Sequence, residues 1–486
     1  VLPSSGSPLP NRVFVAGVAC VGVASVGLFV LRDATLPAVT ALLALVIVWL
    51  GLVPGFLYLR APAEERPPFP LMPLTGLFYA AFFGLPAFFA FHLRDPETGT
   101  INFFGNGYVD AISLEAQALV IGGMALMWAV YAGSKRTVWR AIPHLGLPRA
   151  FPLPRLRLLL WGLALGHLAY LYSPVVRALP SVGQFLQPVG YLAFGMFYLL
   201  WCRGDLPRWQ AAAVFLVLLP VALVGVLTKG AVAIPVLILI FFAVLYLHVR
   251  GRPPWLLIVA IPVFFLIAYP TTGYYRGHAW GAAGQGMTTV EKAQTLVRAI
   301  LWTYGSAGRG RFDRETVGLV RRVALILTLT HVVDRTPDPV PYWAGETYKP
   351  LFTSMIPRAV WPGKPEERTG NLFGRRYGVL AETERQLSFN LPWITEMYAN
   401  FGRAGVIVGM ALVGLLFGFL ERFLARPGMT ALEFVTGTTI LLPLFFQESN
   451  FSLMTGSLLP LTVSLWLYFT VGLRVPLPDL RFSRRV

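Results

Sequence analysis

The segments GETYKPLFTSMIPRAVWPGKPEERTGNLFG (Gly345–Gly374) and LPWITEMYANFGRAG (Leu391–Gly405) lie in a polar stretch that interrupts an otherwise apolar chain. The stretch covers residues 271–403. It contains the sequence's densest set of cationic, acidic and aromatic residues, between an apolar run that ends at Pro270 and another that begins at Ala404. Because the flanking sequence is suited to lipid, we expect the chemistry of the protein in this stretch.

The composition predicts an all-α protein that crosses a membrane many times. The mean hydropathy is +0.64, with 56% hydrophobic and 13% charged residues among 486, values that a water-soluble domain would not reach. Runs long enough to cross about 30 Å of hydrocarbon predict about twelve spanning helices. They lie near residues 13–31, 36–59, 71–92, 111–132, 156–173, 182–201, 210–228, 230–249, 254–270, 404–424, 430–447 and 452–473. We expect the first to be a retained span and not a signal peptide.

Three regions follow from this pattern. Residues 1–270 carry spanning helices one to nine, residues 271–403 form a large structured loop outside the cytoplasm, and residues 404–486 carry helices ten to twelve and a basic cytoplasmic tail. Cys20 and Cys202 lie in or beside apolar runs, so the sequence offers neither a disulfide framework nor a zinc site. We expect no metal and no cofactor.

The positive charges predict the orientation. With a cytoplasmic N-terminus, nineteen of the 40 Lys and Arg residues lie in segments that face the inside, and the short outside segments hold only Arg32, Arg94, Arg177 and Lys229. This split predicts that both termini are cytoplasmic and that the large loop is periplasmic. The inside charges would contact anionic lipid headgroups, whereas a loop on the outer side is poorly placed to bind nucleic acid.

The large loop has local signals of structure. Thr288-Thr289-Val290-Glu291 is a capping box that predicts a helix to about Tyr304. Val317–Val333 has apolar residues with Arg321 and Arg322 on a polar side, which predicts an amphipathic helix at the membrane interface. Pro357, Pro362, Gly363 and Pro365 break any helix after Met355.

The order of motifs in this loop resembles that of the Wzy-type oligosaccharide repeat-unit polymerases, which include the O-antigen polymerases. The motifs are Gly345-Glu346-Thr347-Tyr348, Ile356-Pro357-Arg358, Trp361-Pro362-Gly363-Lys364-Pro365 and Glu396-Met397-Tyr398-Ala399-Asn400-Phe401-Gly402. Thr228-Lys229-Gly230 and Tyr275-Arg276 look like shorter polar motifs that such proteins carry between earlier helices. Family members often have arginine where this chain has Lys229, which keeps the charge but loses the planar fork. The first 220 residues share only hydropathy with the family.

The resemblance implies a GT-C-like glycosyltransferase of the bacterial inner membrane. It would move a growing glycan from undecaprenyl pyrophosphate onto the next lipid-linked repeat unit, without a nucleotide sugar or a metal, and a chain-length regulator would be a partner. Such a reaction needs fixed cations for the diphosphate leaving group. The candidates are Arg358, Lys364, Arg276 and Lys229. The alternative is that these side chains mark the membrane surface. Lys229 differs because it lies in a very short turn between two apolar helices, where an unpaired charge is expensive and tends to face a cavity.

The acceptor hydroxyl must lose a proton to a carboxylate or a histidine. The candidates are Glu396, His331, Asp334 and Glu346. Glu396, Asn400 and Arg403 fall on one helix face, so an ion pair between Glu396 and Arg403 is the structural alternative. Sugar contacts are expected from Tyr348, Trp361, Tyr398 and Asn400, although interfacial belts also use aromatic residues.

Three other functions fit parts of the pattern. An O-antigen ligase would use the same donor and transfer the glycan to a lipid A core. A twelve-helix transporter would be expected to have its main connection inside, after the sixth helix, and not outside after the ninth. A lipid-linked oligosaccharide flippase would be expected to have its cations within the helices. The motif order favours a polymerase.

Overall fold

The computed structural model describes residues 11–62, 64–179, 182–230, 232–280, 284, 286–305, 312–354, 356, 361–364, 368–426 and 428–474. Most of these residues are helical. Ten helices within the described ranges are long and apolar enough to cross a membrane. The chain is therefore a multi-pass membrane protein, as the composition predicts.

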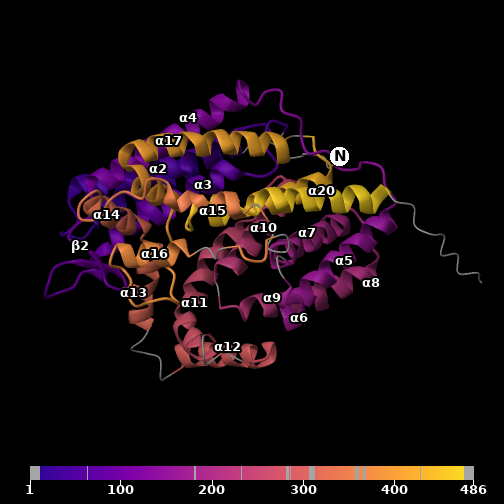
Figure 1. Cartoon of the computed structure of the whole chain (residues 1–486). Helices are drawn as coiled ribbons and strands as arrows, with labels where there is room; N and C mark the ends of the chain where they lie inside the picture. The colour runs from indigo at the N-terminus through magenta and orange to yellow at the C-terminus, as the bar shows by residue number, and fades with distance from the viewer. Residues whose placement is uncertain are drawn as a thin grey trace, which may run out of the picture.

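The region before the polar stretch is a succession of helices with one small hairpin (Figure 1). Its elements are α1 (Asn11–Val30), α2 (Ala38–Arg60), α3 (Leu71–Tyr79), η1 (Ala80–Gly84), η2 (Leu85–Leu93), β1 (Ile101–Phe104), β2 (Gly107–Val109), α4 (Leu114–Arg136), α5 (Leu153–Tyr172), α6 (Pro174–Ala178), α7 (Val182–Cys202), α8 (Arg208–Ala212), η3 (Ala213–Leu218), α9 (Leu219–Leu227), α10 (Ala233–Arg250) and α11 (Trp255–Ala279). The antiparallel pair β1–β2 is a detail that the all-α prediction lacks.

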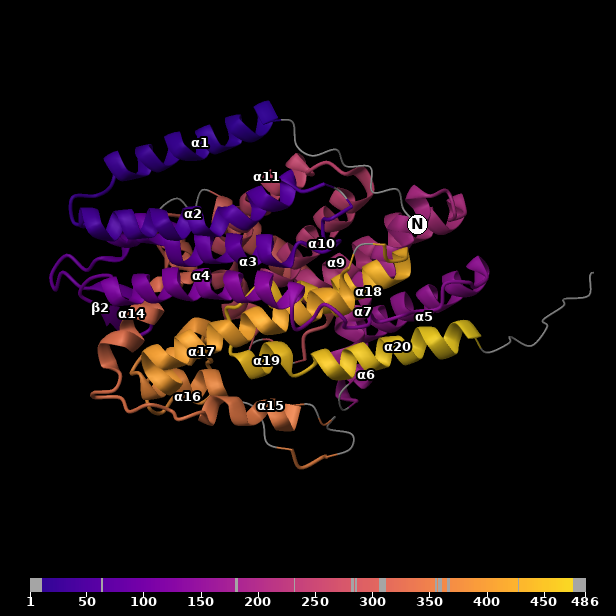
Figure 2. The same ribbon diagram turned by 90° about the horizontal axis from the view of Figure 1, so that it is seen from above.

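Each of the twelve apolar runs lies on helical structure. Ten of them coincide with the helices that are long and apolar enough to span, including α3 with η1 and η2 as one segment. The run near residues 156–173 is α5, and the run near 430–447 is a shorter apolar helix, Ala431–Phe445. In Figure 2 the end of α20 lies toward the right of the view, and β2 and α14 lie at the left.

The described residues of the polar stretch form six helical elements between α11 and α17. They are α12 (Thr289–Tyr304), α13 (Phe312–Val323), α14 (Leu325–Arg335), η6 (Glu346–Tyr348), α15 (Lys349–Ser354) and α16 (Thr369–Arg376). The capping box at Thr288 and Glu291 is confirmed, since each residue's side chain bonds the other's backbone N–H. The prediction of a single interfacial helix over Val317–Val333 is wrong. The chain breaks at Ala324, and Leu325–Val332 is buried because α14 packs against α4, α17 and β2.

The C-terminal region consists of α17 (Trp393–Leu424), α18 (Ala431–Leu441), η7 (Leu442–Phe445), α19 (Phe451–Thr455) and α20 (Leu458–Arg474). Helix α17 is interrupted at Gly402, whose φ of 62° and ψ of −146° are not helical. The carbonyls of Ala399 and Asn400 instead accept bonds from the backbone N–H groups of Trp343 and Ala344. The loop before η6 is thereby joined to the first part of α17.

Helices α4 and α17 pack closely along their length (Figure 2). Gly414 and Gly418, four residues apart, face α4, and a Cβ at Gly414 would lie 2.5 Å from the carbonyl oxygen of Met127. A Cβ at Gly418 would overlap the hydroxyl of Ser134. Small residues at this spacing let the backbones of membrane helices approach. The two helices therefore form one tightly joined pair.

Candidate functional site

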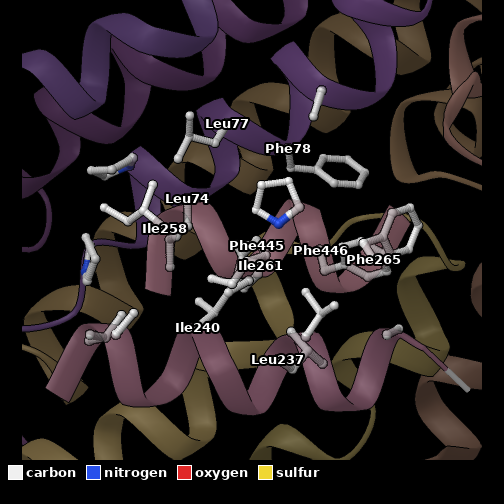
Figure 3. Close-up of a pocket in the computed structure, with 18 of the residues that line it drawn as sticks. Leu74, Leu77, Phe78, Leu237, Ile240, Ile258, Ile261, Phe265, Phe445 and Phe446 are labelled. Carbon is white, nitrogen blue, oxygen red and sulfur yellow. The ribbon is translucent and has the colours of Figure 1, made fainter. Parts of the chain in front are cut away.

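Two cavities meet in the interior of the helical bundle. The first has a volume of about 610 Å³ and is lined mainly by apolar side chains of α2, α3, α10, α11 and η7. Figure 3 shows its wall, with Leu74, Leu77 and Phe78 from α3 and Leu237 and Ile240 from α10. The second cavity, of about 820 Å³, has polar residues in its wall. Arg322, Lys349, Lys364, Asn390 and Glu448 are among them.

The boundary between the cavities is an ion pair between Arg322 and Glu448. Both residues line both cavities. Arg322 lies in the last turn of α13, and Glu448 in the connection between η7 and α19. Nη1 of Arg322 contacts Oε1 of Glu448, and the side-chain amide of Asn390 donates to the same oxygen. The Glu448 side chain is 2% exposed and that of Arg322 is 36% exposed. A buried carboxylate is therefore matched by a cation that remains partly accessible.

The residues on both sides of Glu448 are held by α3 and α17. Tyr79 donates from its hydroxyl to Oε1 of Gln447 at 2.8 Å, and the carbonyl of Gln447 accepts from the backbone N–H of Trp393 at 3.2 Å. Glu396 Oε2 accepts from the backbone N–H of Phe451 at 2.6 Å. These bonds on either side of Glu448 fix the position of the turn that carries its carboxylate.

Further cations line the two cavities. Arg276 lines the apolar cavity and is close enough to Arg322 for the two to repel one another. Lys349 and Lys364 line the polar cavity. Among the described residues, these four cations outnumber Glu448 and the Glu346 carboxylate beside Lys349, so the two cavities together carry a net positive charge. A positively charged junction beside an apolar cavity favours binding of an anionic headgroup with an apolar tail.

The predicted phosphate-binding residues are distributed over three places. Arg276 donates to the carbonyl of Gly230 from Nε at 3.2 Å and Nη2 at 3.1 Å, and its guanidinium lies 4.5 Å from the Trp280 ring centroid. Arg276 therefore lies beside the turn that carries Lys229. Lys364 lines the polar cavity and donates to the carbonyl of Ile356 at 3.1 Å. Arg358 lies outside the described residues.

Lys229 faces a small separate cavity. This cavity has a volume of about 20 Å³, and His167 and Gln187 also line it. The Nζ of Lys229 lies 4.7 Å from the ring centroid of Tyr170. Burial, with repulsion from Arg177, lowers the pKa of Lys229. The prediction that this lysine faces a cavity between helices is confirmed, but it is not in the wall of either large cavity.

None of the four candidate bases lines either large cavity. Glu396 is fully buried at the start of α17. His331 is 1% exposed, with Nδ1 3.0 Å from the carbonyl oxygen of Tyr108 and Nε2 2.8 Å from that of Tyr377. Asp334 is exposed at the end of α14, and the exposed Glu346 lies 3.6 Å from the Nζ of Lys349.

The predicted structural pairing of Glu396 with Arg403 is wrong. Arg403 instead makes a two-pronged ion pair with Glu115 of α4, with Nε and Nη2 each 2.7 Å from a carboxylate oxygen. The break at Gly402 is the physical reason. It turns the second part of α17 relative to the first, so residues 396 and 403 no longer share a regular helix face.

None of the four candidate sugar contacts is in the wall of either large cavity. Asn400 is buried and accepts from the backbone N–H of Gly345, while its amide donates to Thr347 Oγ1 at 2.8 Å. Tyr398 is also buried, and its hydroxyl donates to Glu115. Tyr348 is half-buried 6.3 Å from the Phe451 ring, and burial raises the pKa of its phenol. Trp361 is 40% exposed.

Sequence reasoning missed Glu448 and Asn390. The sequence does contain a signal for Glu448, because Gln447-Glu448-Ser449-Asn450 is a short polar segment between two apolar runs. An ionisable residue within such a region is expensive to bury and commonly functional. This turn lies outside the large loop, in which the sequence predicts the chemistry. No signal in the sequence joins Asn390 to it.

Comparison with known proteins gives a family but no described activity. No curated protein and no solved structure matches the chain. One family model matches residues 155–451, and its description is a domain of unknown function, DUF8712. The matched part begins in α5 and ends in α19, so it contains Arg276, Arg322, Asn390 and Glu448. Because the match covers more than half of the 486 residues, the chain belongs to the DUF8712 family.

Proposed function

We propose that the protein is a membrane glycosyltransferase that polymerises undecaprenyl-pyrophosphate-linked oligosaccharide repeat units into a surface polysaccharide, without a metal. The observation that carries the proposal is the apolar cavity that meets a cationic cavity at Arg322 and Glu448. A polyprenyl-diphosphate-linked glycan has a matching sequence of parts, with a long apolar tail, a doubly charged diphosphate and a polar glycan.

Each part of such a ligand has a matching part of the site. The tail would lie among the side chains of α3, α10 and α11, and the glycan in the polar cavity. The diphosphate would lie at the junction, where Arg276, Arg322, Lys349 and Lys364 supply positive charge. Negative charge grows on the diphosphate as the glycosidic bond breaks, and fixed cations lower the energy of that transition state. The resemblance adds Arg358 to this set.

The proposal includes a location and a topology. The protein would lie in the bacterial inner membrane with twelve spans, a GT-C-like arrangement, cytoplasmic termini and a periplasmic large loop. The supports are the charge asymmetry of the short connections and the helical structure over all twelve apolar runs. A chain-length regulator is a proposed partner.

The test uses the purified protein in lipid nanodiscs with lipid-linked repeat units extracted from cells that make them. A ladder of products on a gel is the expected result. A single transfer onto added lipid A core would show a ligase instead. Movement of intact lipid-linked repeat units across sealed vesicles, without new glycosidic bonds, would show a flippase or transporter.

Two neighbouring arginines provide a matched comparison. Arg322→Gln removes a cation from the junction and should lower the rate by about 10²-fold or more, as loss of one strong transition-state donor does. Arg321→Gln removes the same charge from the exposed side of α13, outside both cavity walls, and should leave the rate within about twofold. Equal rates for the two variants would contradict the assigned junction.

A further inference from the structure

Glu448 lies where a proton acceptor would be needed, between the proposed positions of the donor headgroup and the acceptor. It lies in the wall of both cavities, where a headgroup and a second substrate would meet. Among the described residues, Arg322 and Asn390 both bond its Oε1 atom, and neither bonds Oε2. A carboxylate held by one oxygen keeps its second oxygen available to a hydroxyl group.

The same ion pair makes the pairing of the Glu448 carboxylate depend on whether a ligand is bound. Glu448 neutralises Arg322 in the structure, so an incoming diphosphate and Glu448 compete for one guanidinium. Diphosphate carries more negative charge and binds arginine through several oxygens, so it is the stronger partner. Asn390 remains as a neutral donor that holds Glu448 Oε1 when Arg322 turns to the ligand.

We propose that Glu448 is the general base of the transfer and that the donor diphosphate releases it by taking its place on Arg322. This inference rests on the proposed function and adds the acceptor-activating residue to it. The order of events has a consequence for the enzyme. Arg322 neutralises the charge of the carboxylate until a donor is bound, so an acceptor or water that enters first meets a carboxylate whose charge is still compensated by arginine.

The step balances without any further reactant. The oxygen of an acceptor sugar hydroxyl forms a bond to the anomeric carbon of the donor glycan. The bond from that carbon to the diphosphate oxygen breaks, and the diphosphate leaves with the electron pair. The hydroxyl proton moves to Oε2 of Glu448, and Arg322 with its neighbouring cations holds the charge on the leaving group.

The first experiment measures binding of undecaprenyl diphosphate to the purified protein in nanodiscs, with uncharged undecaprenol as the comparison probe. Glu448→Gln keeps an acceptor for Asn390 and removes the competing charge. It should bind the diphosphate about tenfold more tightly than the wild type and should bind undecaprenol equally. Equal diphosphate affinity for the wild type and Glu448→Gln would overturn the displacement.

The second experiment measures turnover with lipid-linked repeat units. Glu448→Gln should lose about 10²-fold or more in rate although its donor binding is intact, and Glu448→Asp should recover part of the rate. The matched control is Glu421→Gln, because Glu421 is a buried carboxylate paired with Lys135 that lines neither cavity. The control should lower the melting temperature and leave the rate per folded molecule unchanged.

The outcomes separate the inference from the proposed function. A wild-type protein that makes no polymer would overturn the proposed function and the base with it. A wild-type protein that makes polymer, together with a Glu448→Gln variant of normal rate, would overturn only the assignment of Glu448. A melting curve for each variant shows that the compared samples are folded.

Discussion

The hydroxyl of Tyr342 lies 2.6 Å from the place that a Cβ would occupy at Gly402. Gly402 has a φ of 62°, in a region that side chains with a Cβ rarely adopt. The carbonyls freed by this break accept the backbone N–H groups of Trp343 and Ala344, next to Tyr342. One glycine therefore both ends the first part of α17 and makes room for the loop that caps it.

Gly402→Ala should destabilise the protein. The strained backbone costs about 1–3 kcal/mol, and displacement of Tyr342 adds to it. The measurement is the melting temperature in detergent. Gly122→Ala in α4 is the control, because a Cβ at Gly122 meets nothing within 4 Å and alanine favours a helix. A Gly402→Ala protein as stable as the control would mean that α17 can continue unbroken.

Glu396→Gln should lower stability far more than rate. The carboxylate accepts the backbone N–H of Phe451 at the start of α19, and its removal weakens the support of the turn that carries Glu448. The expected cost is about 1–3 kcal/mol. Turnover per folded molecule should fall much less than the roughly 10²-fold that loss of a base causes. Normal stability combined with a roughly 10²-fold loss of turnover would instead identify Glu396 as the general base.

The stability of the folded protein should decrease as the pH falls below about 6.5, in part because of His331. Burial lowers the pKa of His331 below its ordinary value of 6.5. The folded protein therefore keeps this ring neutral where the unfolded chain binds a proton, and the stabilisation present above that pH is lost on acidification.

His331→Gln should make the melting temperature less dependent on pH between about 7.5 and 5. His278→Gln, at an exposed position, is the control and should retain the wild-type slope. Identical slopes for the wild type and His331→Gln would contradict the burial of a neutral ring as the cause.

Cysteine labelling tests the topology. Single cysteines at Gly284 and Gly146, in a protein whose two native cysteines are replaced by serine, should react from opposite sides of the membrane, because the short-loop charges place the large loop outside. A reagent that cannot cross the membrane should label position 284 in intact cells and position 146 only after lysis. Labelling of both positions in intact cells would contradict the orientation.

The sequence predicted the features that depend on near neighbours in the chain. Long apolar runs became helices, and Thr288 with Glu291 formed the expected capping box. The predicted span that begins at Ala404 starts directly after the break at Gly402. Each of these features is determined by hydropathy or by side chains within one helical turn.

The features that the sequence did not predict depend on contacts between distant segments. Arg403 pairs with Glu115, and Glu448 with Arg322 and Asn390, across separations that no local pattern encodes. The same holds for α14, whose apolar residues suit a membrane surface but are buried by α4 and α17. The participation of Arg358 stays a prediction.

The glycine contacts between α4 and α17 restrict how the protein can open. Two helices whose backbones touch cannot slide or separate without losing contacts along their whole length. This pair is a fixed part of the protein, and α17 carries bonds that hold the turn of Glu448. Helices α10 and α11 line the apolar cavity and are mostly unburied within the protein. The lipid carrier that the proposed function requires would therefore enter and leave sideways past α10 and α11, while α17 holds the turn of Glu448 in place.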